Sequence, residues 1–317
     1  MAQFKAANIY HFGSHLRARP INQEDVLPVK REQPLISVYQ DELGAPADFS
    51  RLLVFGWLPE GRTPFIDQRV RQAVSMAVDR DLYLNVIFNT PAFAAEGLPV
   101  MTRWNTVLSG AREGWWLDPA GTEFGPNSKY LRHDIAEGKK LLAAAGYPNG
   151  FSVKSNYVTS AEFPVARQAE MMDGFIRELG IRTTVNPLGY SDEYIPKYRD
   201  GNGQYEGWAY VAGSTNDDPV ASMSNQYWSR GGIPSFQGFS AGGRNDQSGD
   251  PKVDTWIEQA RVELDVDRRK SILKDLQRYL AGQMYSIPAP GVGTAFTVAW
   301  PCVGNFRVFS GARLNYG

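Results

Sequence analysis

The chain has 317 residues, 43% of them hydrophobic and 21% charged, with a formal net charge of −1. It is long enough to bury a sizeable core in one large domain or in two or three smaller ones. The balanced charge gives a nucleic-acid partner no electrostatic support, and no apolar run approaches the roughly 20 residues of a membrane-spanning helix. We therefore expect a globular protein with no nucleic acid among its partners.

The single cysteine, Cys302, excludes an internal disulfide framework and any metal site built from several cysteines. The first residues, MAQFKAANIYHFGSH, lack the basic and apolar regions of a signal peptide. Either the protein stays in the cytosol, or its secretory signal lies outside this chain.

Residues 1–60 contain three short segments with the composition of β-strands, at 4–12, 35–39 and 51–57. They are too short to form a domain by themselves. We expect them to pair with strands elsewhere, either in the C-terminal tail or in residues outside this chain.

Two helices are predicted between residues 67 and 88. Asp67 is a suitable N-cap, and apolar residues follow it at helical spacing until Asp79-Arg80-Asp81, which predicts a break and a second helix start. The stretch 89–128 is rich in proline and glycine, so we expect a long surface loop, packed through its aromatic side chains rather than disordered.

Strands and helices alternate between residues 133 and 212. A helix over 133–145 ends at Gly146, and the elements predicted after it are a strand at 151–158, a helix at 163–179, a strand at 181–188, a short helix at 191–199 and a strand at 205–212. This alternation predicts an α/β fold with at least one parallel strand pair.

The last third begins with a glycine-rich polar segment, 231–250, which we expect to be a surface loop. Two helices are predicted at 253–264 and 267–285. The tail 287–309 is strand-like but interrupted by prolines.

The sequence contains no recognisable catalytic motif. His11 and His15 are four residues apart, but a glycine lies between them and no further ligand completes a metal set. The segment 201–207 resembles a dinucleotide loop, yet a strand follows it instead of a helix. Asp217 and Asp218 are sequence neighbours, which rarely face one substrate bond together. We therefore expect no catalytic residue, no metal and no cofactor.

The stretch EGWAYVAGSTNDDP, residues 206–219, places small polar residues and two carboxylates directly after an apolar strand. One interpretation is a plain turn that leads into a helix cap, because each of these residue types favours such positions. The other interpretation is the rim of a ligand cleft.

Residues 63–89 resemble a motif of the extracellular solute-binding proteins of family 5, the relatives of dipeptide- and oligopeptide-binding components of ABC importers. The matching residues are Phe65, Asp67, Arg69, Val70, Arg71, Gln72, Ala73, Ala77, Asp79 and Arg80. Residues 136–151 and 267–290 resemble two further blocks of the same family. From their positions near helix ends, we expect the three arginines of the motif to fix helices and lobe packing rather than to bind ligand.

The resemblance implies an α/β, periplasmic-binding-protein-like fold of class II, with two lobes, hinge strands and a ligand between the lobes. Residues 1–60 would be the end of lobe one and a hinge crossing, 61–286 lobe two, and 287–317 the return hinge and the C-terminal part of lobe one. Family members are longer and begin with a signal peptide. We therefore expect an N-terminally truncated chain, with the second lobe nearly complete and the first partial.

In peptide-binding relatives, a Gly-Trp pair at the end of a strand precedes an aspartate that pairs with the ligand's α-ammonium group. Gly207-Trp208 matches this pair, but no acid follows closely, and Asp217-Asp218-Pro219 resembles a later helix start. The resemblance therefore does not single out a peptide. The predicted ligand-binding residues are Trp208, Tyr210, Gly213, Ser214, Thr215 and Asn216, with Trp104, Trp115 and Trp116 as further walls. The alternatives are core packing for the tryptophans and a plain turn for 214–216.

The function implied is capture of a small solute, peptide-like or other, by a non-catalytic component of an ABC importer. Its partners would be the solute and the permease subunits in the membrane. We expect a monomer in the periplasm or outside the cell, associated with the envelope. Two alternatives stay open: a hydrolase or transferase on an α/β fold, and a solute receptor for signalling.

Overall fold

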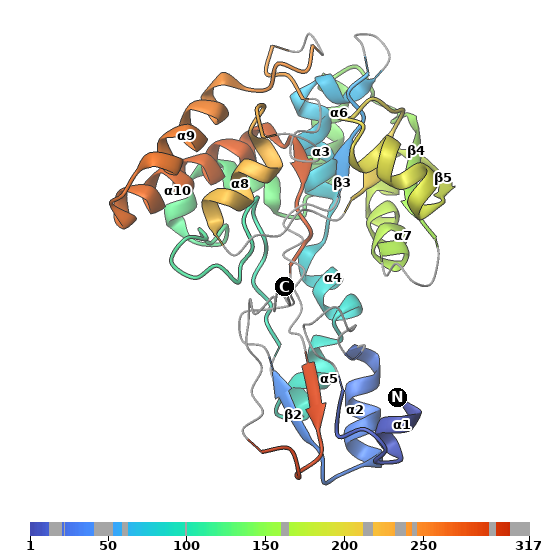
Figure 1. The fold of residues 1–317 in the computed structure, drawn as a ribbon. Helices are drawn as coiled ribbons and strands as arrows, with labels where there is room; N and C mark the ends of the chain where they lie inside the picture. Colours follow the sequence, from blue (N-terminus) through green and yellow to red (C-terminus); the bar gives the residue numbers. More distant parts are fainter. Residues whose placement is uncertain are drawn as a thin grey trace. The chain divides into compact units, whose positions relative to one another are not determined.

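The computed structural model describes residues 1–12, 21, 23–40, 53–58, 63–98, 100–159, 165–211, 218–231, 239–242, 246–291 and 296–304. The chain divides into two compact units, drawn in Figure 1. Unit 1 comprises Met1–Asp48, Asp81–Arg103 and Val292–Gly317, and unit 2 comprises Phe49–Arg80 and Trp104–Gly291. The predicted lobes divide the chain differently, because they place residues 49–60 with lobe one and residues 81–103 in lobe two. The lobe-and-hinge interpretation stays a proposal.

Unit 1 is built on a small antiparallel sheet, in which β8 lies between β1 and β2. Its elements are α1 (Ala2–Lys5), β1 (His11–Phe12), α2 (Gln23–Glu32), β2 (Ser37–Gln40), α5 (Thr90–Ala95) and β8 (Phe296–Ala299), and α4 (Arg80–Ile87) leads into it. The C-terminal tail therefore supplies the expected strand partner for the segments predicted at 4–12 and 35–39, whereas the segment at 51–57 pairs in the sheet of unit 2. The rings of Phe93 and Phe296 stack at a centroid distance of 4.6 Å in the core of this unit.

Two expectations for unit 1 are corrected. The segment 4–12 is not one strand, because α1 buries Phe4 in the core as part of a helix and only His11–Phe12 pairs in the sheet. The stretch 89–128 is not loop throughout, because it contains α5, whose Phe93 is fully buried. In both places a buried aromatic residue stabilises a short helix that the surrounding sequence pattern does not predict.

Unit 2 contains a five-stranded sheet in the order β5-β4-β6-β3-β7. The strands are β3 (Leu53–Phe55), β4 (Ser152–Val158), β5 (Arg182–Leu188), β6 (Trp208–Tyr210) and β7 (Ser286–Ile287). Strand β4 pairs parallel with β5 and β6, whereas β3 pairs antiparallel with β6 and β7. Helix α7 (Val165–Arg177) connects β4 to β5, and the π-helix η4 (Tyr190–Arg199) connects β5 to β6. The predicted α/β architecture with parallel pairing is confirmed.

Several helices of unit 2 begin directly after an aspartate whose side chain accepts a hydrogen bond from a backbone N–H of the first turn. They are α3 (Gln68–Ala77), α6 (Ile135–Ala144), α8 (Pro219–Tyr227), α9 (Pro251–Val262) and α10 (Val266–Gln283). These aspartate caps satisfy backbone donors that a helix start leaves free, which explains why the starts of these helices can be predicted from the sequence. Unit 2 also contains the short 3₁₀ helices η1 (Pro64–Ile66), η2 (Thr122–Phe124) and η3 (Pro126–Leu131).

The arginines of the 63–89 motif make intramolecular contacts, as expected. Buried Arg71 donates to the carbonyl oxygens of Phe65, Ile66 and Gln283 at 2.7, 2.9 and 2.9 Å. Buried Arg80 donates to the carbonyl oxygen of Leu131, which links the first residue of α4 to the end of η3.

In the described part of the chain, no helix is both long and apolar enough to cross a membrane.

Candidate functional site

Strand β6 carries the two predicted site residues that are best defined, Trp208 and Tyr210. They are two positions apart, so their side chains lie on the same face of the sheet. Both are fully buried. The Trp208 indole Nε1 donates to Ser155 Oγ at 3.2 Å, and the Tyr210 hydroxyl donates to Asp173 Oδ1 at 2.7 Å. Their polar groups are therefore bound to β4 and α7.

Asp173 is fully buried beneath this strand. Burial raises the pKa of its carboxyl group above the ordinary aspartate value, and the hydrogen bond donated by Tyr210 partly opposes that shift. The network of Ser155, Asp173, Trp208 and Tyr210 holds the last residues of β6 in a defined position. It thereby fixes the point from which the chain leaves the sheet.

The predicted site residues Gly213, Ser214, Thr215 and Asn216 lie outside the described residues. The chain is described again at Asp218, whose Oδ1 accepts from the Ala221 backbone N–H at 2.8 Å and caps α8. Pro219 occupies the first turn, where the missing N–H costs nothing. The predicted acidic-proline helix start is confirmed.

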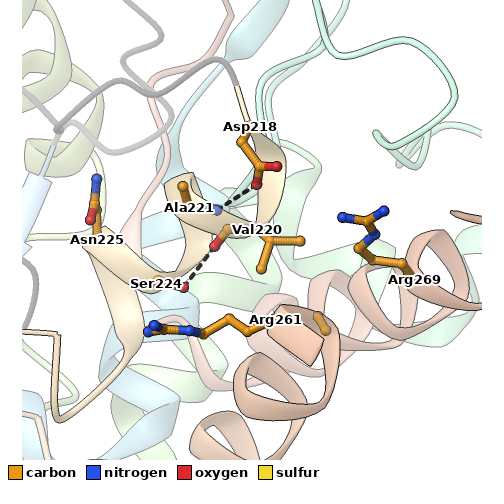
Figure 2. A pocket seen from close by; sticks show the side chains of 8 residues that line it. Asp218, Val220, Ala221, Ser224, Asn225, Arg261 and Arg269 are labelled. Atoms are coloured by element: carbon orange, nitrogen blue, oxygen red, sulfur yellow. Dashed lines mark hydrogen bonds between the residues drawn. The ribbon is translucent and has the colours of Figure 1, made fainter. Parts of the chain in front are cut away.

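A hollow of about 360 Å³ opens beside α8. Figure 2 shows Asp218 at one end of this helix, with the Arg261 and Arg269 side chains on the neighbouring helices α9 and α10. The residues that line the hollow are Asp218, Val220, Ala221, Ser224, Asn225, Ala260, Arg261 and Arg269. The lining combines small side chains with one carboxylate and two guanidinium groups. The hollow is therefore lined in part by the end of the stretch 206–219, which the sequence marks as a candidate cleft rim.

Aromatic rings hold both arginines of the hollow. The Arg261 guanidinium lies 4.1 Å from the Trp228 ring centroid, and the Arg269 guanidinium lies 5.8 Å from that of Trp115. In the described ranges neither arginine forms an ion pair. Guanidinium groups stacked on rings keep their N–H edges available for other acceptors.

The three loop tryptophans lie in unit 2 and are half-buried. Trp116 Nε1 donates to the Trp104 carbonyl oxygen at 3.0 Å, and Trp104 forms an antiparallel bridge with Gly291. Trp115 is tied to α10, because its carbonyl oxygen accepts from Gln277 Nε2 at 2.9 Å and its ring faces Arg269. Trp115 thus contacts a residue that lines the hollow. The assignment of all three tryptophans as ligand walls stays a prediction.

Arg261 and Arg269 are not among the residues predicted from the sequence. They stand on different helices, and only the packing of α9 on α8 and α10 brings them to one hollow. Arg269 lies inside the 267–290 block, but nothing in the sequence pairs it with Arg261. Among the described residues, no group of three or more His, Cys, Asp or Glu side chains could hold a metal ion.

Comparisons with known proteins agree with this architecture. Residues 22–232 match the family described as bacterial extracellular solute-binding proteins, family 5 Middle. The matched range includes β6 and α8, the two elements that lead into the hollow.

Curated relatives include the glutathione-binding protein GsiB of Pectobacterium atrosepticum, 23% identical over 79% of this chain and 44% of that protein. A probable di/tripeptide-binding protein of Pseudomonas aeruginosa is 24% identical over 71% of this chain and 38% of that protein. The chain therefore spans less than half the length of these relatives.

A solved structure shows the fold. The periplasmic binding protein DppA of Helicobacter pylori, in complex with the peptide STSA, superposes with a TM-score of 0.66 at 16% sequence identity. The superposition covers 98% of this chain and 52% of DppA. The chain has the α/β, periplasmic-binding-protein-like fold that the sequence predicts.

Proposed function

The chain belongs to the bacterial extracellular solute-binding proteins of family 5, and from this membership we propose that it acts in an ABC importer as the component that captures a small solute. The solute would be handed to permease subunits in the membrane. We propose that the protein works as a monomer in the periplasm or on the outer side of the cell. Its role would be binding without chemistry.

The observation that carries this proposal is the family match over 22–232, which contains both β6 and the start of α8. The segment between them, 212–217, contains Gly213 to Asn216, which we propose as contacts to the solute. Backbone N–H groups and small hydroxyls suit many polar solutes. The hollow beside α8 would extend this contact surface.

The solute class is proposed more broadly than peptides. The relatives named above include a glutathione-binding and a probable di/tripeptide-binding protein, which supports a peptide-like solute. The residues after Gly207-Trp208 do not supply the early aspartate expected for an α-ammonium group. Other small polar solutes, such as opines, sugars and polyamines, therefore belong in the test.

We expect the tryptophan emission of the protein to shift saturably with one solute class from a panel of tripeptides, sugars, opines and polyamines. The reason is that Trp115 and Trp228 contact the arginines that line the hollow. Trp115→Phe should reduce the amplitude of the shift. Trp256→Phe serves as the control, because Trp256 does not line the hollow and packs on Tyr279 at 5.5 Å. A folded protein whose emission responds to no member of the panel would count against the proposal.

A further inference from the structure

Two arginines line the hollow beside α8. We propose that Arg261 and Arg269 form an anion subsite there, so that the captured solute carries a carboxylate or phosphate group. This inference deepens the proposed function and rests on it.

Arg261 and Arg269 both lack a counterion within the described residues. Other arginines of unit 2 have one: Arg199 pairs with Asp200, Arg230 with Glu258 and Arg278 with Asp275, each at 2.7 Å. Two unpaired cations that line one hollow repel each other, and an anion between them would relieve that repulsion.

The side chain of Arg269 has an N–H donor, at Nε, without an acceptor among the described residues. Its side chain is half-buried, and its Nε is shielded from solvent and has no hydrogen-bond partner among the described residues. A shielded donor without a partner is unfavourable. An anion that accepts from the same guanidinium would give this side chain the charged acceptor it lacks, and carboxylate and phosphate both match the planar fork.

The acids near the two arginines already bind other groups. Among the described residues of the lining, Asp218 is the only acid, and its Oδ1 accepts a hydrogen bond from the Ala221 N–H. The acids near Arg269 along the chain are also engaged, since Asp265 caps α10 through the Arg268 N–H at 2.8 Å and Asp267 pairs with Lys270 at 3.4 Å. The described lining thus contains two guanidinium groups and one carboxylate, which leaves it net positive.

The side chains beside the two arginines are small. Val220, Ala221 and Ala260 present short apolar side chains to the hollow, and Ser224 directs its hydroxyl to the Val220 carbonyl oxygen at 2.8 Å. These groups neither fill the hollow nor compete for the arginines. The hollow of about 360 Å³ therefore has room for a compact anionic group beside α8.

The test observes the arginine Nε–Hε resonances of the full chain by ¹⁵N NMR during titration with sodium acetate, inorganic phosphate or methylammonium chloride at constant ionic strength. We expect acetate, phosphate or both to shift the Arg261 and Arg269 resonances saturably, and methylammonium to leave them unchanged. A response to acetate alone would identify a carboxylate group, and a response to phosphate alone a phosphate group.

Matched variants sharpen the result. Arg269→Gln should weaken anion binding at Arg261 by about tenfold or more, whereas Arg268→Gln, an exposed neighbour outside the lining, should not change it. The subsite is overturned if neither anion shifts Arg261 and Arg269 saturably, or if Arg268 responds equally.

The same variants separate this inference from the proposed function. A panel solute that binds an Arg261→Gln, Arg269→Gln double variant as tightly as the unmodified chain would overturn the subsite and leave the proposed function intact. Saturable anion shifts in a protein that binds no panel solute would support the subsite and count against the proposed function.

Discussion

Replacing Gly207 with alanine is expected to lower the free energy of unfolding by more than about 3 kcal/mol, which is in the range reserved for severe local defects. Gly207 has φ +83°, a conformation that residues with a side chain rarely adopt. A Cβ atom there would lie 2.1 Å from the Lys154 carbonyl oxygen, a backbone atom of β4 that cannot move aside without disturbing the sheet. Strand β6 would lose its entry point, and with it the position of Trp208.

The control is Gly146→Ala. Gly146 has φ +92°, but nothing lies within 4 Å of its Cβ position, so the substitution introduces only backbone strain of about 1–2 kcal/mol. Urea unfolding followed by tryptophan emission measures both variants, because every tryptophan except Trp300 lies in unit 2. Equal losses for the two variants would show that the approach of Gly207 to Lys154 is not as close as described.

Replacing Arg71 with methionine is expected to destabilise unit 2 by about 3–5 kcal/mol, because each buried carbonyl oxygen that loses its hydrogen-bond donor costs about 1–3 kcal/mol. Burial lowers the pKa of Arg71 to about 10, which still leaves it charged at neutral pH. Methionine keeps much of the apolar stem but leaves the carbonyl oxygens of Phe65, Ile66 and Gln283 without this donor. Rings of Trp57 and Tyr285 lie 5.3 and 5.2 Å from the guanidinium and would lose their cation.

Arg69→Met is the matched control, two residues away on the same helix. Arg69 is exposed and pairs with Asp67 at 2.6 Å, and exposed pairs of this kind contribute little to stability. The midpoint of the urea transition should therefore fall clearly for Arg71→Met and hardly at all for Arg69→Met. A small effect at Arg71 would mean that its motif position serves something other than packing.

The features predicted correctly from the sequence are those set by local chemistry. Asp67 caps α3, and the helix over 133–145 ends next to Gly146 because glycine adopts the positive φ that a helix end favours. The alternation of strands and helices from 151 to 212 was sufficient to predict parallel pairing, which β4 forms with β5 and β6.

The features that the sequence did not reveal depend on contacts between distant residues. Helix α1 replaces part of a predicted strand because Phe4 packs in a core that includes Phe296. The arginine pair of the hollow depends on how α9 packs against α8 and α10, and no spacing rule joins residue 261 to residue 269. The sequence predicts Trp208 and Tyr210 as ligand-binding residues. Their hydrogen bonds to Ser155 and Asp173 cannot be predicted in this way, because they form only in the folded sheet.

The most direct test of the account is native mass spectrometry of the folded chain in an equimolar mixture of tripeptides, glutathione, sugars, opines and polyamines. We predict a single saturable complex of one solute molecule per chain, with a solute that carries a carboxylate or phosphate group. Circular dichroism of the same sample shows whether the chain is folded. A folded chain that is observed only in its unbound mass, at every solute concentration, would contradict the claim that this protein captures a small solute.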